Sequence, residues 1–501
     1  MALQPMNYDV PVAISGAGPV GLSLGLGLAR LGVRSVIFEK EAELPPHSRA
    51  GAVWQRSVEI FRSWGMLDEL KAEGIVATTI DPTDVDANRT IFTLDFSPLA
   101  AETLEPYPVF VPQDRTEAVL CAALAQTGLC EVRFRHEVLG LAQDADSVTL
   151  RVRDENGIES NVRAAFAVGA DGARSAVRAA LGLTLDGKTY PLRVMLADVE
   201  VDDARNDLPW PRFSFRRKEG FAGILHFGRG LWRIISPIAA DAADDAVLAE
   251  EAVGKLVRIL LGAGPFNYVW GSTFQIHARR AKRFVIGRAI LAGDAAHLNS
   301  PAGGQGMNTG IADAHNLAWK LASILQGDGD AATLLASYEE ERLGVFASVV
   351  ERNTDAITRV LLLSAEKLRP MLIRIAGLLV SLPFLRKTIL MTASMLGQRY
   401  AQSPILSGRG AVLGLRSPDP ALACGGPATL VLRRMPREFA GAAEAALKVK
   451  THALNARAAR RWRMRGPFAA LVRPDGYVGW IARDPSAAEI ERGVRTALGL
   501  R

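Results

Sequence analysis

Cysteine is scarce in this sequence of 501 residues. It occurs at three positions, Cys121, Cys130 and Cys424, and none of them belongs to a CxxC pair. So few cysteines, without paired spacing, argue against a disulfide scaffold and against a zinc site. The sequence therefore predicts no bound metal and a reducing, cytoplasmic location.

The sequence also lacks a targeting segment and an apolar run long enough to span a membrane. Residues 1–9 have neither the basic start nor the apolar core of a signal peptide. In the most hydrophobic stretch, residues 371–396, the longest uncharged run covers residues 375–385. That run is about half the length that a membrane span needs. We predict no transmembrane segment. A buried or interface helix and peripheral membrane contact both stay open for this stretch.

Acidic residues are in the minority, which gives a net charge of +6 and a pI near 9.3. Arginine outnumbers lysine along the whole chain, so a compositional bias accounts for this charge as well as an acidic partner would. The densest basic stretch surrounds Trp462 and contains Arg457, Arg460, Arg461, Arg463 and Arg465. We interpret it as a solvated helix face and expect no nucleic-acid partner, with membrane contact as the alternative.

The size and composition indicate a globular enzyme with more than one domain. A chain of this length exceeds what one hydrophobic core supports, so we expect two or three domains. Apolar residues make up 49% and charged residues 22%, which is ordinary for a globular protein. No internal repeat is present.

A glycine-rich loop between a strand and a helix is the first feature that carries chemistry. An apolar run over residues 10–14 precedes it, a helical pattern to residue 31 follows, and its sequence is Gly16-Ala17-Gly18-Pro19-Val20-Gly21. In such a GxGxxG loop the first glycine makes the turn, the second admits a pyrophosphate, and the third lets the helix pack on the sheet. The free N–H groups of the first helical turn and the helix dipole favour the diphosphate.

A carboxylate follows this loop at the expected spacing. A second strand, residues 35–38, ends at Glu39, with Lys40 next to it. An acidic residue about 20 positions after the loop accepts hydrogen bonds from the adenosine ribose hydroxyls. We therefore include Glu39 and Lys40 among the cofactor contacts.

A further glycine-containing segment, residues 293–306, is suited to the flavin end of a dinucleotide. Gly293 and Asp294 follow a short buried strand, and the Asp294 carboxylate can accept a hydrogen bond from a ribityl hydroxyl. The segment Pro301-Ala302-Gly303-Gly304-Gln305-Gly306 presents bare backbone to the flavin ring, and a long helix over residues 306–325 begins there. The positive end of this helix points at the ring edge where reduced flavin gathers negative charge.

Other polar residues near these segments have two interpretations each. Asp171, within Gly169-Ala170-Asp171-Gly172, fits a loop near the pyrophosphate and a nicotinamide route, but alone it would be an ordinary turn. Arg174 and Arg178 either meet phosphates or are solvated. His297 is more readily a structural histidine than a base.

Together these segments resemble the class A flavoprotein aromatic hydroxylases, of the para-hydroxybenzoate hydroxylase type. The resemblance covers about residues 8–350, and it includes residues 168–175 as the family's "DG" segment and residues 292–297 with 303–308 as its "GD" segment. It implies that Arg49 and Gln113 contact the cofactor, and that Met307 and Asn308 do so at the start of the long helix.

The tail resembles the degenerate thioredoxin-like domain of phenol hydroxylase and 3-(3-hydroxyphenyl)propionate hydroxylase. The match rests on residues 471–476, with an Asp475-Gly476 turn, and on Trp480. The tail has no CxxC pair, so we expect a packing or dimer role instead of redox exchange. A homodimer therefore stays open.

The predicted fold class is α/β: a Rossmann-like FAD-binding domain with an inserted, mostly antiparallel β-sheet substrate domain and a small C-terminal thioredoxin-like αβ domain. We assign residues 1–74, 107–189 and 280–350 to the FAD-binding domain and residues 75–106 and 190–279 to the substrate domain. Residues 351–402 form a helical connector, and residues 403–501 form the thioredoxin-like domain.

The resemblance implies a reaction in which NAD(P)H reduces non-covalently bound FAD and O2 then forms a C4a-hydroperoxyflavin that hydroxylates a phenolic or polycyclic aromatic substrate. The nicotinamide visits transiently, because the chain has no second dinucleotide loop. The backbone of Pro301, Gly303 and Gly304 is expected at the flavin face. Candidates for a base that ionises the substrate are Tyr190, His226 and Arg216, each more readily structural. Trp54 either lines the pocket or packs in a helix.

Three other functions are alternatives for an FAD-binding chain of this kind. A halogenase on this scaffold carries a WxWxIP segment, whereas residues 230–235 lack its first tryptophan and its proline. A reductase would form product without O2. A non-catalytic flavin-binding protein would bind FAD without consuming NAD(P)H in response to a substrate. The sequence leaves open which aromatic compound is hydroxylated and whether NADH or NADPH is used.

Overall fold

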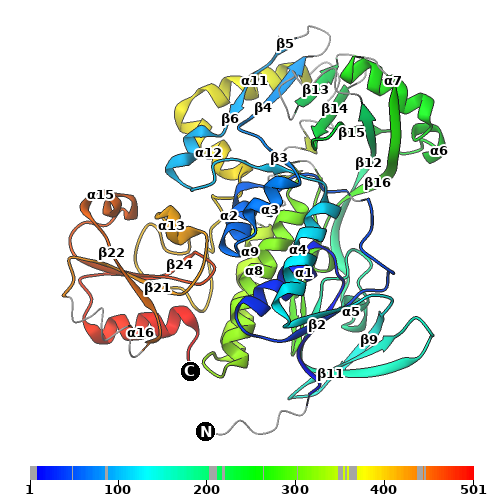
Figure 1. Cartoon of the computed structure of the whole chain (residues 1–501). Coiled ribbons are helices and arrows are strands. Elements are labelled where there is room, and N and C mark those ends of the chain that lie inside the picture. The colour runs from blue at the N-terminus through cyan, green and yellow to red at the C-terminus, as the bar shows by residue number, and fades with distance from the viewer. Residues whose placement is uncertain are drawn as a thin grey trace.

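The computed structural model places three parts side by side (Figure 1). It describes residues 8–47, 49–84, 89–201, 212–216, 220–262, 265–301, 303–347, 354–355, 358–359, 369–436, 444 and 447–501. The sequence pattern of residues 438–447 predicts a helix, and this segment lies largely outside the described residues.

The first part is built on an eight-stranded sheet. Its parallel strands are, in spatial order, β18 (Ala289–Leu291), β11 (Glu159–Gly169), β1 (Val10–Ser15), β2 (Ser35–Phe38) and β8 (Cys130–Arg133). The antiparallel strands β17 (Val285–Ile286), β10 (Val148–Arg153) and β9 (Glu137–Gln143) complete it. The central strands are continuous apolar runs because both faces of a parallel sheet are buried.

Three helices cover this sheet as one layer: α1 (Pro19–Arg30), α4 (Gln113–Thr127) and α8 (Gly306–Leu325). They lie next to one another in Figure 1, with α1 packed against both of the others. The glycines of α1 permit this close packing. A Cβ at Gly27 would lie 2.8 Å from the Cβ of Ala318 in α8, and one at Gly25 would lie 3.0 Å from the side chain of Ile37 in β2.

The second part is a nine-stranded, mostly antiparallel sheet. Its central strands are the long pair β12 (Leu185–Val201) and β16 (Phe266–Ala281), followed by β15 (Leu231–Ile238), β14 (Gly220–His226) and β13 (Arg212–Arg216). The strands β4 (Thr79–Asp84), β5 (Arg89–Thr90), β6 (Leu94–Asp95) and β19 (His297–Leu298) join this sheet from other regions of the chain. Helix α7 (Glu250–Leu261) covers one face through Val253, Val257 and Leu260.

Two local expectations differ from the structure. The apolar pattern of residues 54–70 predicts one amphipathic helix, but the structure has two, α2 (Gln55–Ser63) and α3 (Leu67–Ala72), because Gly65 adopts a left-handed φ of 70° between them. Residues 91–111, rich in Phe, Thr and Pro, predict extended chain, whereas they contain β6, a short β7 (Val109–Phe110) and the 3-10 turn η1 (Ser97–Ala101). Pro98 is the second residue of that turn, and proline is readily accommodated in a first helical turn.

The third part is a five-stranded mixed sheet with the order β20 (Ser407–Gly408), β24 (Val478–Arg483), β23 (Phe468–Val472), β21 (Thr429–Arg433), β22 (Lys450–Ala453). Helix α16 (Ala487–Leu498) packs on it and starts with a capping box between Ser486 and Glu489. This arrangement is compatible with a thioredoxin-like domain, which stays a prediction. Trp462 is fully buried beneath the neighbouring exposed arginines.

Helices α9 (Ala331–Val345), α11 (Arg369–Ser381) and α12 (Pro383–Ala393) lie between the second and third parts in the chain. Among the residues that the structure describes, no helix combines the length and apolar character that crossing a membrane requires.

A buried cluster of charges fastens the third part to helices α8 and α9. Arg473 binds Glu341 of α9 through both terminal nitrogens, at 2.6 and 3.0 Å. Glu341 also accepts hydrogen bonds from Lys320 at 2.9 Å and from Asn316 at 2.8 Å, both on α8. These charged side chains are at most 1% exposed. Removal of one partner would therefore leave another buried charge without its counter-charge.

We expect Arg473→Met to lower the free energy of unfolding by about 3–5 kcal/mol, because Glu341 and Asp475 would lose their main counter-charge. Urea unfolding measures the loss. The matched control is Arg460→Met, since Arg460 is exposed and should change stability little. Equal stability of the two variants would show that the buried cluster does not fasten the tail.

Candidate cofactor and active site

The first two glycine-containing segments are in direct contact. Gly16 has a φ of 101°, and a Cβ at this position would lie 2.5 Å from the carbonyl oxygen of Ala170. The Gly16 N–H donates to the Phe38 carbonyl, and the Ala170 N–H donates to the Ser15 carbonyl, each at 2.8 Å. The ends of β1, β2 and β11 thus meet at one edge of the sheet, where parallel sheets place their ligands.

The amino end of α1 has a free first turn. Gly18 is the N-cap residue and provides no side-chain cap, and Pro19 follows it. A Cβ at Gly21 would lie 1.9 Å from the Gly16 carbonyl oxygen, so Gly21 is required by the fold. A Cβ at Gly18 would meet nothing within 4 Å. Gly18 therefore borders open space at a positive helix end, which suits a diphosphate.

Glu39 is held against the same loop. Its Oε2 accepts a hydrogen bond from the Ala17 N–H at 2.8 Å, and its Oε1 accepts one from the Glu41 N–H at 3.1 Å. Each carboxylate oxygen keeps a further lone pair for a ribose hydroxyl. The Lys40 side chain is exposed and lies 3.6 Å from the Glu41 carboxylate. Lys40 therefore lies on the protein surface beside this loop.

The amino end of α8 lies against the amino end of α1. Gly293 has a φ of 60°, and a Cβ there would lie 2.7 Å from a methyl group of Val20. A Cβ at Gly310 of α8 would lie 2.4 Å from the same methyl group. Val20 therefore lies between two glycines. Helix α8 also lacks a side-chain cap at its N-cap residue, Gln305, so two free helix ends meet in one region.

The backbone expected at the flavin face is fixed by Trp54 and Asn308. The Trp54 indole N–H lies 2.9 Å from the Gly303 carbonyl and 3.2 Å from that of Gly304. The Asn308 side-chain N–H groups donate to the carbonyls of Ala52 and Gly304. The Asn308 side-chain oxygen accepts a hydrogen bond from the backbone N–H of Trp54 at 2.8 Å. Gly303 and Gly304 have φ values of 93° and 62°, which favour glycine.

The accessibility of this segment agrees with a ligand-facing wall. Pro301 and Gly304 are exposed, Gly306 and Met307 are half-buried, and Asn308 is buried. Ala302 lies outside the described residues. The predicted set of contacts is therefore brought together at the start of α8, with Asn308 as a support for the backbone.

Asp294 follows strand β18 and carries an accessible carboxylate. Its side chain is accessible to water, yet the dense protein around it raises the pKa of its carboxyl group by desolvation. The open space at Gly18, the two uncapped helix ends and the accessible Asp294 carboxylate fit FAD.

Arg49 and Gln113 are linked through Ala50. The Gln113 N–H donates to the Ala50 carbonyl at 3.2 Å, and the Gln113 side-chain oxygen accepts the Ala50 N–H at 3.3 Å. Arg49 is exposed, and its guanidinium lies 5.1 Å from the centre of the Phe274 ring in β16. Arg49 therefore lies on a loop next to the substrate sheet, and Gln113 holds that loop from the first turn of α4.

A buried arginine of the substrate sheet clamps this loop, and sequence analysis missed it. Arg233 in β15 donates to the carbonyls of Arg49 and Ala50 at 2.9 and 3.0 Å. Two further N–H groups bind both oxygens of Asp198 in β12 at 2.7 Å. Arg233 is 1% exposed. The one sequence signal for it was an arginine within an otherwise apolar strand, which indicates a buried partner.

Glu117 matches the family pattern beside Gln113, but the sequence assigned it no role of its own. It lies one turn after Gln113 in α4, accepts the Gln113 side-chain N–H at 2.8 Å, and is 1% exposed. Its other oxygen is buried with no hydrogen-bond partner among the described residues. Burial raises the pKa of the Glu117 carboxyl to about 7. Glu117 therefore orients the Gln113 amide at a cost in desolvation.

Asp171 and His297 have structural partners. Asp171 accepts the N–H groups of Ala176 and Val177 at 2.8 and 3.2 Å, and so caps α5 (Ala176–Ala180). The Nε2 atom of His297 lies 2.7 Å from Asp313, and the ring stacks on Phe346 with centroids 4.5 Å apart. The structural interpretation of His297 agrees with these contacts.

The arginines after Asp171 differ from each other. Arg178 donates to the carbonyls of Ala173 and Ala295 at 2.7 and 3.0 Å, which ties the second glycine segment to the third. Arg174 is exposed. The role of Arg178 is therefore to join two loops of the cofactor region.

The three candidates for a base are dispersed. The Tyr190 hydroxyl donates to Asp355, which also binds Lys188 at 2.5 Å. His226, at the end of β14, stacks on Trp232 with ring centroids 4.0 Å apart. Arg216 is in β13, and its side chain lies outside what the structure describes. The contacts of these three residues do not assign a catalytic role to any of them.

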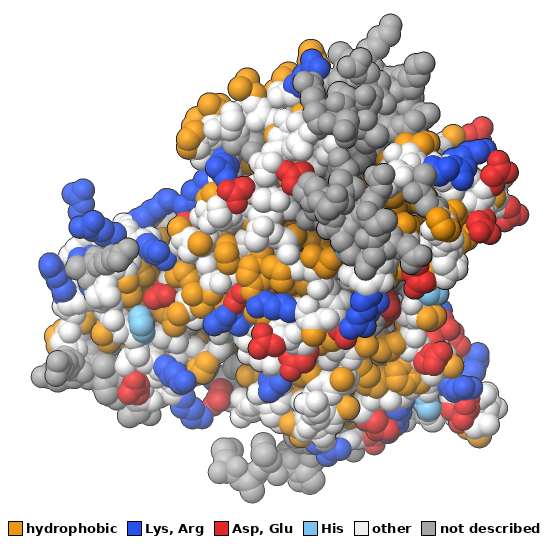
Figure 2. Space-filling view, turned by 45° about the horizontal axis from the view of Figure 1, so that its top comes forward, with side chains coloured by type: hydrophobic (Ala, Val, Ile, Leu, Met, Phe, Trp, Pro, Cys, Tyr) orange, Lys and Arg blue, Asp and Glu red, His pale blue; other side chains and the backbone are white. Residues whose placement is uncertain are grey.

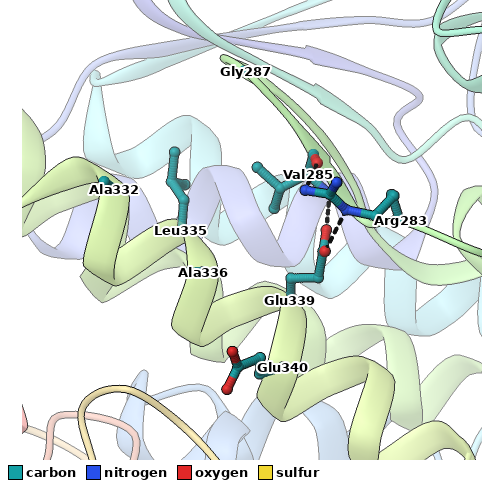
Figure 3. Close-up of a pocket in the computed structure, with 8 residues that line it drawn as sticks. All are labelled: Arg283, Val285, Gly287, Ala332, Leu335, Ala336, Glu339 and Glu340. Atoms are coloured by element: carbon teal, nitrogen blue, oxygen red, sulfur yellow. Dashed lines mark hydrogen bonds and ion pairs between the residues drawn. The ribbon is translucent and has the colours of Figure 1, made fainter.

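A separate hollow of about 400 Å³ lies between β17 and α9 (Figure 3). Its walls include Arg283 and Glu339, which form an ion pair at 2.5 Å. Glu339 also accepts the N–H groups of Phe284 and Val285, so its carboxylate is used by the fold. No residue of the three glycine segments lines this hollow, and we assign it no function.

Comparison with known proteins agrees with this geometry. Residues 9–353 match the family model "FAD binding domain", and residues 412–500 match "Aromatic-ring hydroxylase, C-terminal". The chain belongs to the FAD-dependent aromatic-ring hydroxylases. The resemblance stated from the sequence, the α/β fold class, the FAD cofactor and the monooxygenase activity are therefore confirmed.

Among its relatives is the uncharacterized aromatic compound monooxygenase YhjG of Bacillus subtilis, 31% identical, with 98% of each chain covered. The 12-dehydrotetracycline 5-monooxygenase/anhydrotetracycline 6-monooxygenase of Streptomyces rimosus is 31% identical over 99% of each chain. Among solved structures, aklavinone-11 hydroxylase in a complex with FAD and aklavinone has a TM-score of 0.83, with 26% identity over 98% of this chain and 99% of that one.

We expect Gly18→Ala to fold normally but to bind FAD more weakly, because its Cβ enters open space that the diphosphate would need. The flavin-to-protein absorbance ratio and the thermal midpoint measure the two effects. Gly344→Ala is the matched control, since its Cβ also meets nothing within 4 Å but lies in helix α9. Normal flavin content in Gly18→Ala would contradict the placement of the diphosphate.

Glu117 predicts a pH dependence of stability in the flavin-free protein. Its folded-state pKa of about 7 exceeds the ordinary value of 4.5, so its contribution is full below pH 4.5 and is lost as pH rises towards 7. Relative to Glu117→Gln, wild-type protein should lose up to about 3 kcal/mol between pH 5 and pH 8. Urea unfolding across this range checks it. A constant difference between the two proteins would show that Glu117 ionises normally.

The Arg233 clamp is tested by separating stability from cofactor binding. Arg233→Met should cost about 3–5 kcal/mol, because Asp198 is left charged and buried, and should also weaken FAD binding. The double variant Arg233→Met/Asp198→Leu removes the stranded charge and should recover stability without recovering FAD affinity. Recovery of both in the double variant would mean that the clamp does not hold the cofactor loop.

Proposed function

We propose that this enzyme uses NAD(P)H and O2 to hydroxylate a phenolic or polycyclic aromatic compound. The observation that carries the proposal is the meeting of two uncapped helix ends, α1 and α8, beside Glu39 and Asp294. One FAD, with its diphosphate at α1 and its ring at α8, accounts for all four features. When bound, FAD supplies the transfer of electrons from the nicotinamide to O2 and of one oxygen atom to the substrate.

The residues of the chain then have distinct roles. Glu39 holds the ribose, the first turn of α1 holds the diphosphate, and Asp294 holds the ribityl chain. The free N–H groups at the start of α8 stabilise negative charge on the ring edge. Trp54 and Asn308 keep the backbone of residues 303–304 in place for the ring.

An aromatic wall adjoins this backbone and supports an aromatic substrate. Trp54 packs edge-on against Phe96 and Phe110, with ring centroids 6.2 and 6.4 Å apart. Phe227 and Leu225 of the substrate sheet belong to the same buried cluster. Such a wall excludes water, which protects reactive oxygen from wasteful release as peroxide.

The relatives support the substrate class without specifying one compound. Their names give anhydrotetracycline, rifampicin and 3-(3-hydroxyphenyl)propionate as the compounds on which those proteins act. We place the substrate of this chain among phenolic and polycyclic aromatics. Tyr190, His226 and Arg216 remain the proposed bases. We also propose a cytoplasmic location, because the cysteines are unpaired. The homodimer remains a prediction.

The test combines NAD(P)H consumption, O2 uptake and peroxide release over a panel of simple and polycyclic phenols. We expect a substrate that accelerates NAD(P)H oxidation and yields a product with one added oxygen, one NAD(P)H and one O2 being consumed for each. Hydroxylation should fall in Gly18→Ala in proportion to its flavin content. Product formed without O2 would indicate a reductase, and FAD binding with no stimulated consumption by any phenol would contradict the proposal.

A further inference from the structure

Helix α11 presents an apolar face to the outside of the molecule. Large apolar side chains at spacings of three and four residues are exposed there, namely Met371, Ile375, Leu378 and Leu379, and the exposed Leu382 follows the helix. Residues so spaced share one face of a helix. Leu378 is 66% exposed, and Phe384 at the start of α12 is 71% exposed. Figure 2 shows apolar side chains near the top of that view, over the position of α11 in Figure 1.

The opposite side of this helix pair attaches to the body of the protein. A Cβ at Gly377 would lie 3.1 Å from the ring of Phe92, so α11 is in close contact with that ring. In α12, Leu390 is fully buried and Met391 packs against the same cluster as Trp54 and Phe96. The helix pair is therefore anchored on its inner side, and the exposed apolar face is additional to what the fold needs.

The charged residues of α11 and α12 themselves are all basic. From residue 367 to residue 418 the sequence contains no aspartate or glutamate, and its basic residues are Lys367, Arg369, Arg374, Arg386, Lys387, Arg399, Arg409 and Arg416. Arg374 is exposed beside the apolar face. Arg386 and Lys387 bind Asp95 and Glu102 on the inner side, at 2.7 and 2.5 Å.

The basic charge and the apolar face of these helices together favour one kind of binding partner. Two copies meeting through this face would bring like charges together, which is unfavourable. An anionic bilayer offers apolar chains to Leu378 and Phe384 and negative headgroups to Arg374. Helices of this kind lie in the plane of a membrane surface, and neither α11 nor α12 is long enough to cross one.

We propose that α11 and α12 dock the enzyme on the surface of an anionic lipid bilayer, with the apolar face in contact with the acyl chains and Arg374 among the headgroups. The proposal concerns binding and is independent of the flavin chemistry. A failure of the proposed hydroxylation would therefore leave it standing, and the reverse also holds.

Co-sedimentation of the FAD-loaded enzyme with vesicles tests it. We expect binding to vesicles of phosphatidylcholine mixed with phosphatidylglycerol, much weaker binding to pure phosphatidylcholine, and loss of binding as salt increases. Arg374→Gln should weaken binding to the anionic vesicles roughly fivefold.

The apolar contribution is tested with Leu378→Gln/Phe384→Gln, which should lower vesicle partition by at least about tenfold. Ile158→Gln is the matched control, because Ile158 is 63% exposed at the turn between β10 and β11. Its binding should equal that of the wild type. Flavin content and the thermal midpoint establish that each variant is folded.

Three outcomes would overturn the proposal. The first is no binding of the wild type to anionic vesicles, and the second is equal loss in Ile158→Gln and in Leu378→Gln/Phe384→Gln. The third is a wild-type dimer that the double variant converts to a monomer in sedimentation equilibrium without any binding of vesicles. That result would assign the face to a second copy of the chain.

Discussion

The cofactor site depends on the packing of Val20 between Gly293 and Gly310. A Cβ at either glycine would lie within 2.7 Å of a Val20 methyl group, so only glycine lets α1, α8 and the loop after β18 approach so closely. Because neither helix has a side-chain cap, this contact brings two free positive helix ends into one region. Their combined N–H groups make an anionic, elongated ligand favourable there.

Buried ion pairs connect this centre to the rest of the molecule. Arg233 links the substrate sheet to the loop of Arg49 and Ala50, and Arg473 links the C-terminal sheet to Glu341 on α9. Such pairs gain little stability over apolar packing, because their charges leave water. They do fix relative positions, since breaking one leaves a charge unpaired. These ion pairs therefore fix the positions of the substrate sheet and of the C-terminal sheet relative to the cofactor loops.

The sequence predicted what local patterns encode. The glycine loop with Glu39 and the helix over residues 306–325 were placed correctly, because turn geometry and helical periodicity act over short distances. The first half of β12 was missed, since Asp186, Gly187 and Lys188 do not alternate in hydrophobicity. Arg233 was missed and Glu117 was given no role of its own because their partners, Ala50 and the buried surroundings of α4, are known only from the fold. For the same reason Tyr190 and His226 could not be placed relative to a substrate.

The most direct measurement of the central claim is a crystal structure of the FAD-loaded enzyme. We expect the adenosine ribose at Glu39, the diphosphate at the first turn of α1 beside Gly18, and the flavin ring against residues 303–308 at the start of α8. Flavin bound elsewhere, or side chains filling the space beside Gly18 and Asp294, would contradict the central claim.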